Sequence, residues 1–304
     1  MPAPRFLLLA LALLIGFAVA HPAPDHAEIA RRQSVNSLFP VQGYQRAWST
    51  SNVLGSALSL NDNAFRPRNA MTNPARSYGN SPDGRRSLIA TFPQGAVTLN
   101  SNPAGGFSFY APGPDGFSLT GAREVTFAYS VYFPSGFGWQ KGGKLPGLYG
   151  GNSDGEAIGC SGGRHSSACF SARFMWRANG AGELYTYLPP HADNKRYCNR
   201  GDTHCNPQYG DSVGRGAFHF RAGGWTTIAQ RVRLNDVGQS NGEIQVWANG
   251  QSVIDLKGLQ LRTSSSGNFR GMQMQTFFGG SSPDFASPKW QQVFFRDFSI
   301  AIVR

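Results

Sequence analysis

The chain carries many short segments rich in β-branched and aromatic residues, and no segment has a convincing long helical period. Such segments are typical of β-strands, and the 38 glycines and 19 prolines favour turns between them. The predicted strands are 87–92, 107–110, 124–133, 168–177, 183–188, 225–234, 243–248, 252–256, 272–278 and 292–303, with weaker signals at 44–49 and 57–60. About ten such strands predict an all-β fold, a two-sheet antiparallel sandwich or jelly roll.

One turn and the domain organisation also follow from the sequence. Ala248-Asn249-Gly250-Gln251 lies between two predicted strands, and Asn-Gly accepts the positive φ that a type I′ hairpin needs at both central positions. From Gln33 onward there is no internal repeat, charge block or low-complexity tract that would separate modules. Residues 33–304 are therefore predicted to form a single domain.

The N-terminus indicates export. Arg5 precedes an apolar run at 6–15, and Ala18-Val19-Ala20 offers the small residues that a signal peptidase accepts. Residues 1–20 are therefore predicted to be a cleaved signal peptide. The apolar run is too short for a comfortable membrane span and no second long run follows, so we expect a secreted, extracellular protein with no membrane association.

A short propeptide is expected after the signal peptide. Residues 21–32 are rich in proline and alanine and end in Arg31-Arg32, a dibasic pair that resembles a processing site. Cleavage there would leave Gln33 as the mature N-terminus, and the mature chain would stay strongly basic.

The four cysteines agree with an oxidising compartment. Cys160 and Cys169 bracket one polar, glycine-rich loop, and Cys198 and Cys205 bracket another. The economical pairing closes each short loop, although four cysteines allow three connectivities. Zinc is the weaker alternative because there is no C-x-x-C and the nearby histidines lack ligand spacing. We expect no metal and no other cofactor; a structural calcium is left open, because Asp154-Gly155-Glu156 is too short to predict a site.

The charge balance indicates the chemistry of the partner. Lys and Arg number 28 against 17 Asp and Glu, which gives a net charge of +11. A polyanion would be attracted to such a surface, and nucleic acid, acidic polysaccharide and anionic membrane all meet that description. Export and the scattered distribution of the basic residues argue against nucleic acid. The alternative is a charge that serves only the solubility of a secreted protein. We expect a monomer.

The stretch 141–150, Lys-Gly-Gly-Lys-Leu-Pro-Gly-Leu-Tyr-Gly, sets two ammonium groups in a backbone made almost entirely of turn formers. We expect a compact loop in which glycines let a ligand approach the main chain and Pro146 restricts the segment after Lys144. The alternative is a solvated surface turn. What favours function is the polar pattern of the two strands that follow.

Strand alternation gives those two strands a polar face. Ala172, Phe174 and Trp176 are expected on the core side, with Ser171, Arg173, Met175 and Arg177 on the other. Tyr185 and Tyr187 also share a face. If the strands pair as a hairpin around Asn179-Gly180, they bring Ser171, Arg173, Tyr185 and Tyr187 into one patch. Tyrosine and arginine together suit the recognition of sugars and carboxylates, whereas an ordinary solvated sheet face is the alternative.

The residue order is similar to that of a known family. Lys141-Gly142-Gly143-Lys144-Leu145-Pro146-Gly147-Leu148, followed by Ser171-x-Arg173 and Tyr185-x-Tyr187, resembles polysaccharide lyase family 14, which contains alginate and glucuronan lyases with a β-jelly-roll fold. The resemblance extends to Trp48-Ser49-Thr50, Thr276-Phe277-Phe278-Gly279-Gly280 and Ser287-Pro288-Lys289. It implies an enzyme that cleaves a uronic-acid polymer by β-elimination. The loop between Cys160 and Cys169 departs from the pattern and leaves the polymer open.

The resemblance also implies a catalytic set, namely Lys144, Ser171, Arg173, Tyr185 and Tyr187. Their chemistry fits β-elimination, which removes a proton α to a carboxylate and expels the glycosidic oxygen. Arg173 can bind the carboxylate bidentately, and Ser171 can add a hydrogen bond. Lys144 and a tyrosine would divide the roles of base and acid, in an order that the sequence leaves open.

Further residues are candidates for binding substrate. Lys141 and Arg177 flank the expected catalytic set, and Arg231 and Arg233 share one strand face, where a solvated edge is the alternative. His191 follows the tyrosine strand and is a reserve candidate, although a plain loop histidine is favoured there.

Two other classes of protein are alternatives to a lyase. A glycoside hydrolase is disfavoured because no strand carries the pair of carboxylates that hydrolysis of a glycosidic bond needs. The alternative from a different class is a noncatalytic, lectin-like carbohydrate-binding sandwich. The formation of unsaturated product discriminates between lectin and lyase.

Overall fold

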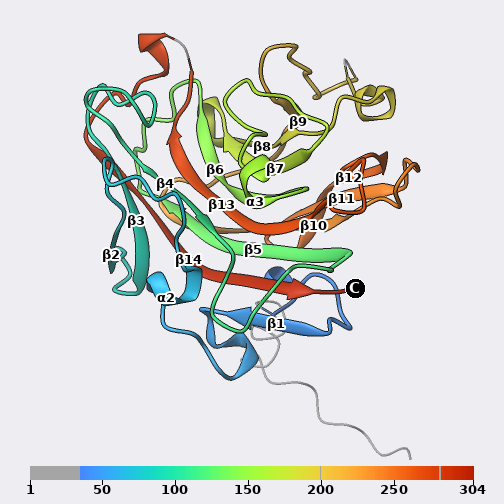
Figure 1. Cartoon of the computed structure of the whole chain (residues 1–304). Helices are drawn as coiled ribbons and strands as arrows, with labels where there is room; N and C mark the ends of the chain where they lie inside the picture. Colours follow the sequence, from blue (N-terminus) through green and yellow to red (C-terminus); the bar gives the residue numbers. More distant parts are fainter. Residues whose placement is uncertain (1–34, 199, 281) are drawn as a thin grey trace, which may run out of the picture.

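The structure is a computed structural model that describes residues 35–198, 200–280 and 282–304. The expected signal peptide, propeptide and Gln33 lie outside the described residues. The chain forms two antiparallel sheets packed face to face, with the six-stranded sheet over the eight-stranded one in Figure 1. The predicted β-sandwich of jelly-roll type is confirmed.

The eight-stranded sheet has the order β12-β11-β10-β5-β14-β3-β2, and β1 also pairs with β14. Its strands are β1 (Arg46–Ser49), β2 (Ser77–Asn80), β3 (Arg86–Phe92), β5 (Glu124–Phe133), β10 (Gly224–Arg233), β11 (Gly242–Ala248), β12 (Gln251–Leu259) and β14 (Gln291–Ile302). The six-stranded sheet has the order β4-β13-β6-β7-β8-β9. Its strands are β4 (Phe107–Ala111), β6 (Gly143–Gly151), β7 (Cys169–Trp176), β8 (Ala181–Tyr187), β9 (Asp211–His219) and β13 (Asn268–Phe278).

The helices are short and lie in the connections. They include η1 (Asn52–Leu54), α2 (Asp62–Phe65), α3 (Asp154–Ala157), η2 (Ala178–Gly180), η3 (Ala192–Lys195) and η4 (Pro283–Phe285). Within the part of the chain that the structure describes, no helix combines the length and apolarity needed to cross a membrane.

The core lies between the sheets and follows strand alternation. Phe174 and Trp176 of β7 are fully buried there, as predicted, opposite Tyr129 of β5. Two polar groups in this layer are paired across the sheets, as burial favours. The Tyr129 hydroxyl donates to the Pro146 carbonyl (3.1 Å), and the Gln230 side chain donates to the Ala172 carbonyl (3.1 Å), so both join the two sheets.

Both predicted turns are confirmed. Asn249 and Gly250 have φ of 49° and 80° between β11 and β12. Asn179 and Gly180 have φ of 58° and 77° in η2, which joins β7 to β8 as an antiparallel pair. Because an L side chain strains the backbone at positive φ, glycine and asparagine are the residues that fit these positions.

The glycine-rich stretch 141–150 departs from expectation. Sequence reasoning assigns it to a loop, whereas most of it forms β6, an interior strand between β13 and β7. A Cβ on Gly147 would lie 2.0 Å from the Ala172 carbonyl oxygen, and one on Gly150 would lie 2.4 Å from that of Asn268. Pro146 sits where the β6–β7 register shifts, a bulge at which a missing N–H is tolerated. The glycines therefore serve close packing of strands rather than a turn.

Two more strands escape the sequence pattern, and one weak signal fails. β2 and β9 are rich in glycine and polar residues, which have low β-propensity, and they are held by their neighbours β3 and β8. Residues 57–60 form no strand. Tertiary pairing outweighs local preference in these segments.

The cysteines pair as the economical connectivity predicts. Cys160 is bonded to Cys169 in the loop between β6 and β7, and Cys198 is bonded to Cys205 in the loop between β8 and β9. Both loops lie beside the six-stranded sheet.

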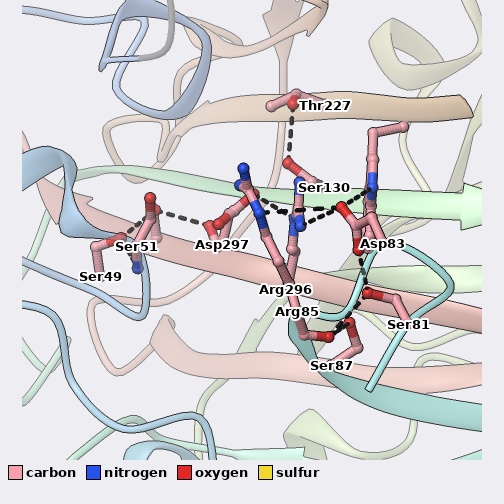
Figure 2. Close-up of polar contacts among 12 residues, drawn as sticks. Ser49, Ser51, Ser81, Asp83, Arg85, Ser87, Ser130, Thr227, Arg296 and Asp297 are labelled. Atoms are coloured by element: carbon pink, nitrogen blue, oxygen red, sulfur yellow. Dashed lines mark hydrogen bonds and ion pairs between the residues drawn. The ribbon is translucent and has the colours of Figure 1, made fainter. Parts of the chain in front are cut away.

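On the eight-stranded sheet, an arginine network is neutralised by carboxylates (Figure 2). Arg296 of β14 donates to Asp83 (2.9 Å) and to Asp297 (3.2 Å), and its guanidinium lies 3.8 Å from the centroid of the Trp225 ring. This is the usual state of a largely buried arginine, which needs a counter-charge nearby.

The packing of β6 predicts a stability effect for Gly147→Ala. The added methyl group meets backbone atoms that cannot move independently, so we expect the free energy of unfolding to fall by about 3 kcal/mol, at the upper end of the range for overpacked cores. Chemical denaturation measures it. The matched control is Gly155→Ala in α3, where a Cβ meets nothing within 4 Å. Equal stability of the two variants would contradict the tight approach of β6.

Candidate active site

A cavity of about 700 Å³ opens on the face of the six-stranded sheet that points away from the core. Its floor consists of side chains from β6, β7, β8 and β13, and its walls include residues from 98–100, 161–164, 204–210 and 279–285. Five expected site residues line it, and they are Lys144, Arg173, Arg177, Tyr185 and Tyr187.

Strand register brings these residues together. Arg173 of β7 is opposite Tyr185 of β8, and Ser171 is opposite Tyr187, as the hairpin hypothesis requires. Lys144 of β6 is opposite Met175 on the other side of β7. Side chains at directly opposed positions share a face, so three adjacent strands place an amine, a guanidinium and two phenols over one floor.

Lys144 is partly buried and lies in a cationic environment. Its Nζ is 3.0 Å from the Met175 sulfur and 4.0 Å from the centroid of the Tyr185 ring. Burial and the guanidinium groups of Arg173 and Arg177 hold the pKa of Lys144 well below the usual range of a lysine, and the Glu183 carboxylate opposes this shift. The neutral amine is therefore accessible at much lower pH than for an exposed lysine.

Arg173 is 2% exposed, and no ion pair links it to a carboxylate among the described residues. Its Nη1 donates to the Gln275 side-chain oxygen (2.8 Å), while its buried Nε has no hydrogen-bond partner in the described part of the chain. Gln275 is in turn held by Gln273 (2.9 Å) and Ser108 (2.9 Å). Neutral amides thus orient the guanidinium without neutralising it, in contrast to Arg296.

The two phenols are fixed by backbone amides of the walls. The Tyr185 hydroxyl oxygen accepts from the Gly210 N–H (3.0 Å), and that of Tyr187 accepts from the Gly163 N–H (3.0 Å). Burial raises the pKa of Tyr185 above the usual range of a phenol, and the neighbouring Tyr187 adds to this shift. Tyr185 therefore keeps its proton at neutral pH.

The structure places Ser171, an expected catalytic residue, outside the cavity lining. Its hydroxyl is fully buried, does not line the cavity, and donates to the Cys160 carbonyl (2.7 Å). This hydrogen bond from the Ser171 hydroxyl holds the Cys160–Cys169 loop against β7. Ser171 can influence the site through that loop, which carries Gly163.

Four expected binding residues also lie outside the cavity lining. Lys141 pairs with Asp284, near the rim. His191 accepts from the Asp193 N–H (3.3 Å) as the N-cap of η3. Arg231 and Arg233 belong to β10 in the other sheet, where both pair with Glu243. Sequence could not separate the sheets, because strand alternation gives a face but not a strand's neighbours.

Several cavity residues were missed by sequence reasoning. They are Arg164, His204, Tyr209, Ser212, Arg215 and Gln275. Gln275 was within reach of the alternation rule in the predicted strand 272–278. The others stand on loops or on the glycine-rich β9, where no periodic signal exists.

One group of potential metal ligands comes together within the described residues, namely Cys198, Cys205 and Asp211. Both sulfurs are committed to a disulfide, and Lys195 donates to the carboxylate (2.7 Å). A thiolate is the form of cysteine that ligates metal, so this group does not fit a metal ion as it stands.

The sequence matches the family model "Polysaccharide lyase 14" over residues 80–298, which contain the whole floor of the cavity. The chain belongs to polysaccharide lyase family 14. It is therefore a polysaccharide lyase rather than a noncatalytic lectin. No curated protein matches the chain.

Two solved structures illustrate the likeness of this lyase to known proteins. The marine PL-14 alginate lyase from Aplysia kurodai is 32% identical, with 84% of this chain and 98% of that one covered and a TM-score of 0.71. Alginate lyase vAL-1 from Chlorella virus is 26% identical, with 79% and 93% covered and a TM-score of 0.65.

The Ser171 hydrogen bond predicts a structural effect of Ser171→Ala. A buried carbonyl would lose its donor, so we expect the free energy of unfolding to fall by about 1–3 kcal/mol. Denaturant melts should show this loss, whereas Ser56→Ala, at an exposed loop position, should leave stability unchanged. An unaltered midpoint for Ser171→Ala would show that the hydrogen bond to Cys160 is not stabilising.

Proposed function

We propose that this lyase is a secreted enzyme that cleaves a uronic-acid polymer, alginate or glucuronan, by β-elimination. The observation that carries the proposal is Arg173, a buried guanidinium that faces a cavity without a carboxylate partner among the described residues. A buried charge without a counter-charge costs several kcal/mol. A substrate carboxylate would remove that cost.

The charge of the cavity lining supports the same class of substrate. The lining contains five basic side chains, and these are Lys144, Arg164, Arg173, Arg177 and Arg215. No Asp or Glu is part of that lining. Glu183 lies behind it and pairs with two of the arginines. Such a surface attracts a polyanion and disfavours a neutral polysaccharide.

The first chemical requirement of β-elimination is to acidify the proton α to the carboxylate. Arg173 would bind the carboxylate and stabilise the negative charge that develops on it as the proton leaves. Gln275 fixes the guanidinium and leaves its other N–H groups for the ligand. The arrangement is therefore in place before substrate binds.

The directions of the pKa shifts support one order of the proton transfers that sequence left open. Lys144, with its pKa held low, is the base that takes the proton and becomes an ammonium. Tyr185, with its pKa raised, keeps its proton and donates it to the departing glycosidic oxygen. The sugar gains a double bond, and proton exchange with solvent restores both groups.

Two further observations support substrate class and compartment. The solved structures described above are alginate lyases, which is what their names say of them. The two disulfides suit an oxidising compartment, in agreement with the expected signal peptide.

Removing the base or the carboxylate ligand tests the proposal directly. We expect wild-type protein to generate ultraviolet-absorbing unsaturated ends from polymannuronate, polyguluronate or glucuronan. Lys144→Ala and Arg173→Ala should lower kcat by at least about 100-fold, because each removes a group that acts in the transition state. Lys257→Ala, on β12 of the other sheet, is the control for a lost lysine charge.

Circular dichroism and thermal melts must show that the variants are folded. Full activity in both folded variants would overturn the site, and no product from any of the three polymers would overturn the substrate class.

The pKa directions also predict the pH profile. Because Lys144 acts as the neutral amine, kcat rises with pH through its lowered pKa and levels off well below 10.5, the usual pKa of lysine. Because the pKa of Tyr185 is raised above 10.0, the plateau extends past that pH. Initial rates from about pH 5 to about pH 11 measure the rise and the plateau. A rise centred near 10.5 would contradict the role of Lys144.

A further inference from the structure

A buried carboxylate lies behind the cavity and takes no part in the proposed reaction. Glu183 of β8 is fully buried, and the β8–β9 register shifts around it. One of its oxygens accepts from Arg177 (2.6 Å), and the other accepts from Arg215 (3.0 Å) and from the Ser212 hydroxyl (2.5 Å). The carboxylate is thus saturated, and its role must be sought in the groups that it holds.

The two arginines both line the cavity, and their side chains are 18% and 38% exposed for Arg177 and Arg215. Two guanidinium groups share one carboxylate, so the cluster keeps an excess of one positive charge. The buried Nε of Arg177 has no hydrogen-bond partner in the described part of the chain. The excess charge and the exposed parts of the two guanidinium groups are therefore left for an anion that enters the cavity.

The local backbone places Arg215 in this position. It stands between Gly214 and Gly216, which have φ of 64° and 86°, and its own N–H donates to the Asp202 carbonyl (2.9 Å). Positive φ on both sides breaks the regular course of β9, and glycine makes this possible without strain. The irregularity is typical of bulges that redirect a side chain toward a site.

The cluster is separate from the carboxylate site at Arg173. Arg177 immediately follows β7, four residues after Arg173, a separation of about 13 Å between their Cα atoms on an extended chain. Arg173 is oriented by Gln275, whereas Arg177 and Arg215 are oriented by Glu183. A polymer that carries a carboxylate on successive units offers one carboxylate to each.

We propose that Arg177 and Arg215, oriented by Glu183, form a second carboxylate-binding subsite that holds a uronate unit further along the polymer from the one at Arg173. Glu183 is a positioning residue in this arrangement. The inference rests on the proposed function for the nature of the polymer. It adds that the cavity recognises two separate acidic units, so binding strengthens with chain length.

Kinetics on the polymer give the first test, with Arg215→Gln as the variant because this side chain is the more exposed of the two. We expect KM to rise about tenfold while kcat stays within about twofold, because the contact is the same in ground and transition states. Arg123→Gln, at an exposed position outside the cavity lining, is the matched control and should change neither value. An unchanged KM, or an equal fall of kcat and kcat/KM, overturns the subsite.

The dependence of binding affinity on oligouronate length gives the second test. A purely structural role of Arg215 or Glu183 would not change that dependence. In a Lys144→Ala background, titration calorimetry with saturated oligouronates should show that Arg215→Gln weakens binding of a hexamer about tenfold and leaves a dimer unaffected. Glu183→Gln, if folded, should reproduce this pattern. Equal weakening of both oligomers, or of neither, contradicts the proposal.

The two proposals fail in different ways. Hexamer binding that depends on Arg215, without any cleavage by wild-type protein, would overturn the lyase mechanism and support the subsite. Cleavage that requires Lys144 and Arg173, with hexamer binding indifferent to Arg215, would support the mechanism and overturn the subsite.

Discussion

The close approach of β6 to its neighbours is the constraint on which the site depends. Gly147 and Gly150 leave no room for a side chain against the backbones of β7 and β13. This packing holds Lys144 in register with Met175 and within 4.0 Å of the Tyr185 ring centroid. A strand with ordinary side chains at these positions would stand further away, and the amine would lose the burial and cationic neighbours that lower its pKa.

The buried arginines on the outer faces of the two sheets differ in whether a carboxylate neutralises them. On the eight-stranded sheet, Arg296 is satisfied by two carboxylates. On the six-stranded sheet, Arg173 is more deeply buried and is oriented only by neutral groups. The second arrangement is unfavourable in the absence of ligand, and the apolar core between the sheets supplies the stability that offsets it. Such a local free-energy cost is typical of a preorganised site that binds a negatively charged group.

The disulfide loops hold the backbone groups that orient the two phenols of the cavity. Cys160–Cys169 closes the loop that carries Gly163, whose N–H holds the Tyr187 hydroxyl. Cys198–Cys205 closes part of the wall that leads to Gly210, whose N–H holds Tyr185. These walls have few apolar residues to pack, so covalent closure limits their motion and keeps both phenols oriented.

Sequence by itself determined the sandwich, the hairpin at Asn179-Gly180 and the shared face of Arg173, Tyr185 and Tyr187, because a period of two and turn chemistry are local properties of the chain. Only the tertiary structure decided that Lys144 stands on an interior strand, that Arg231 faces away on the other sheet, and that Glu183 joins two arginines behind the cavity. These facts depend on which strands become neighbours and on how closely their backbones pack. Neither is encoded in the alternation of any single strand.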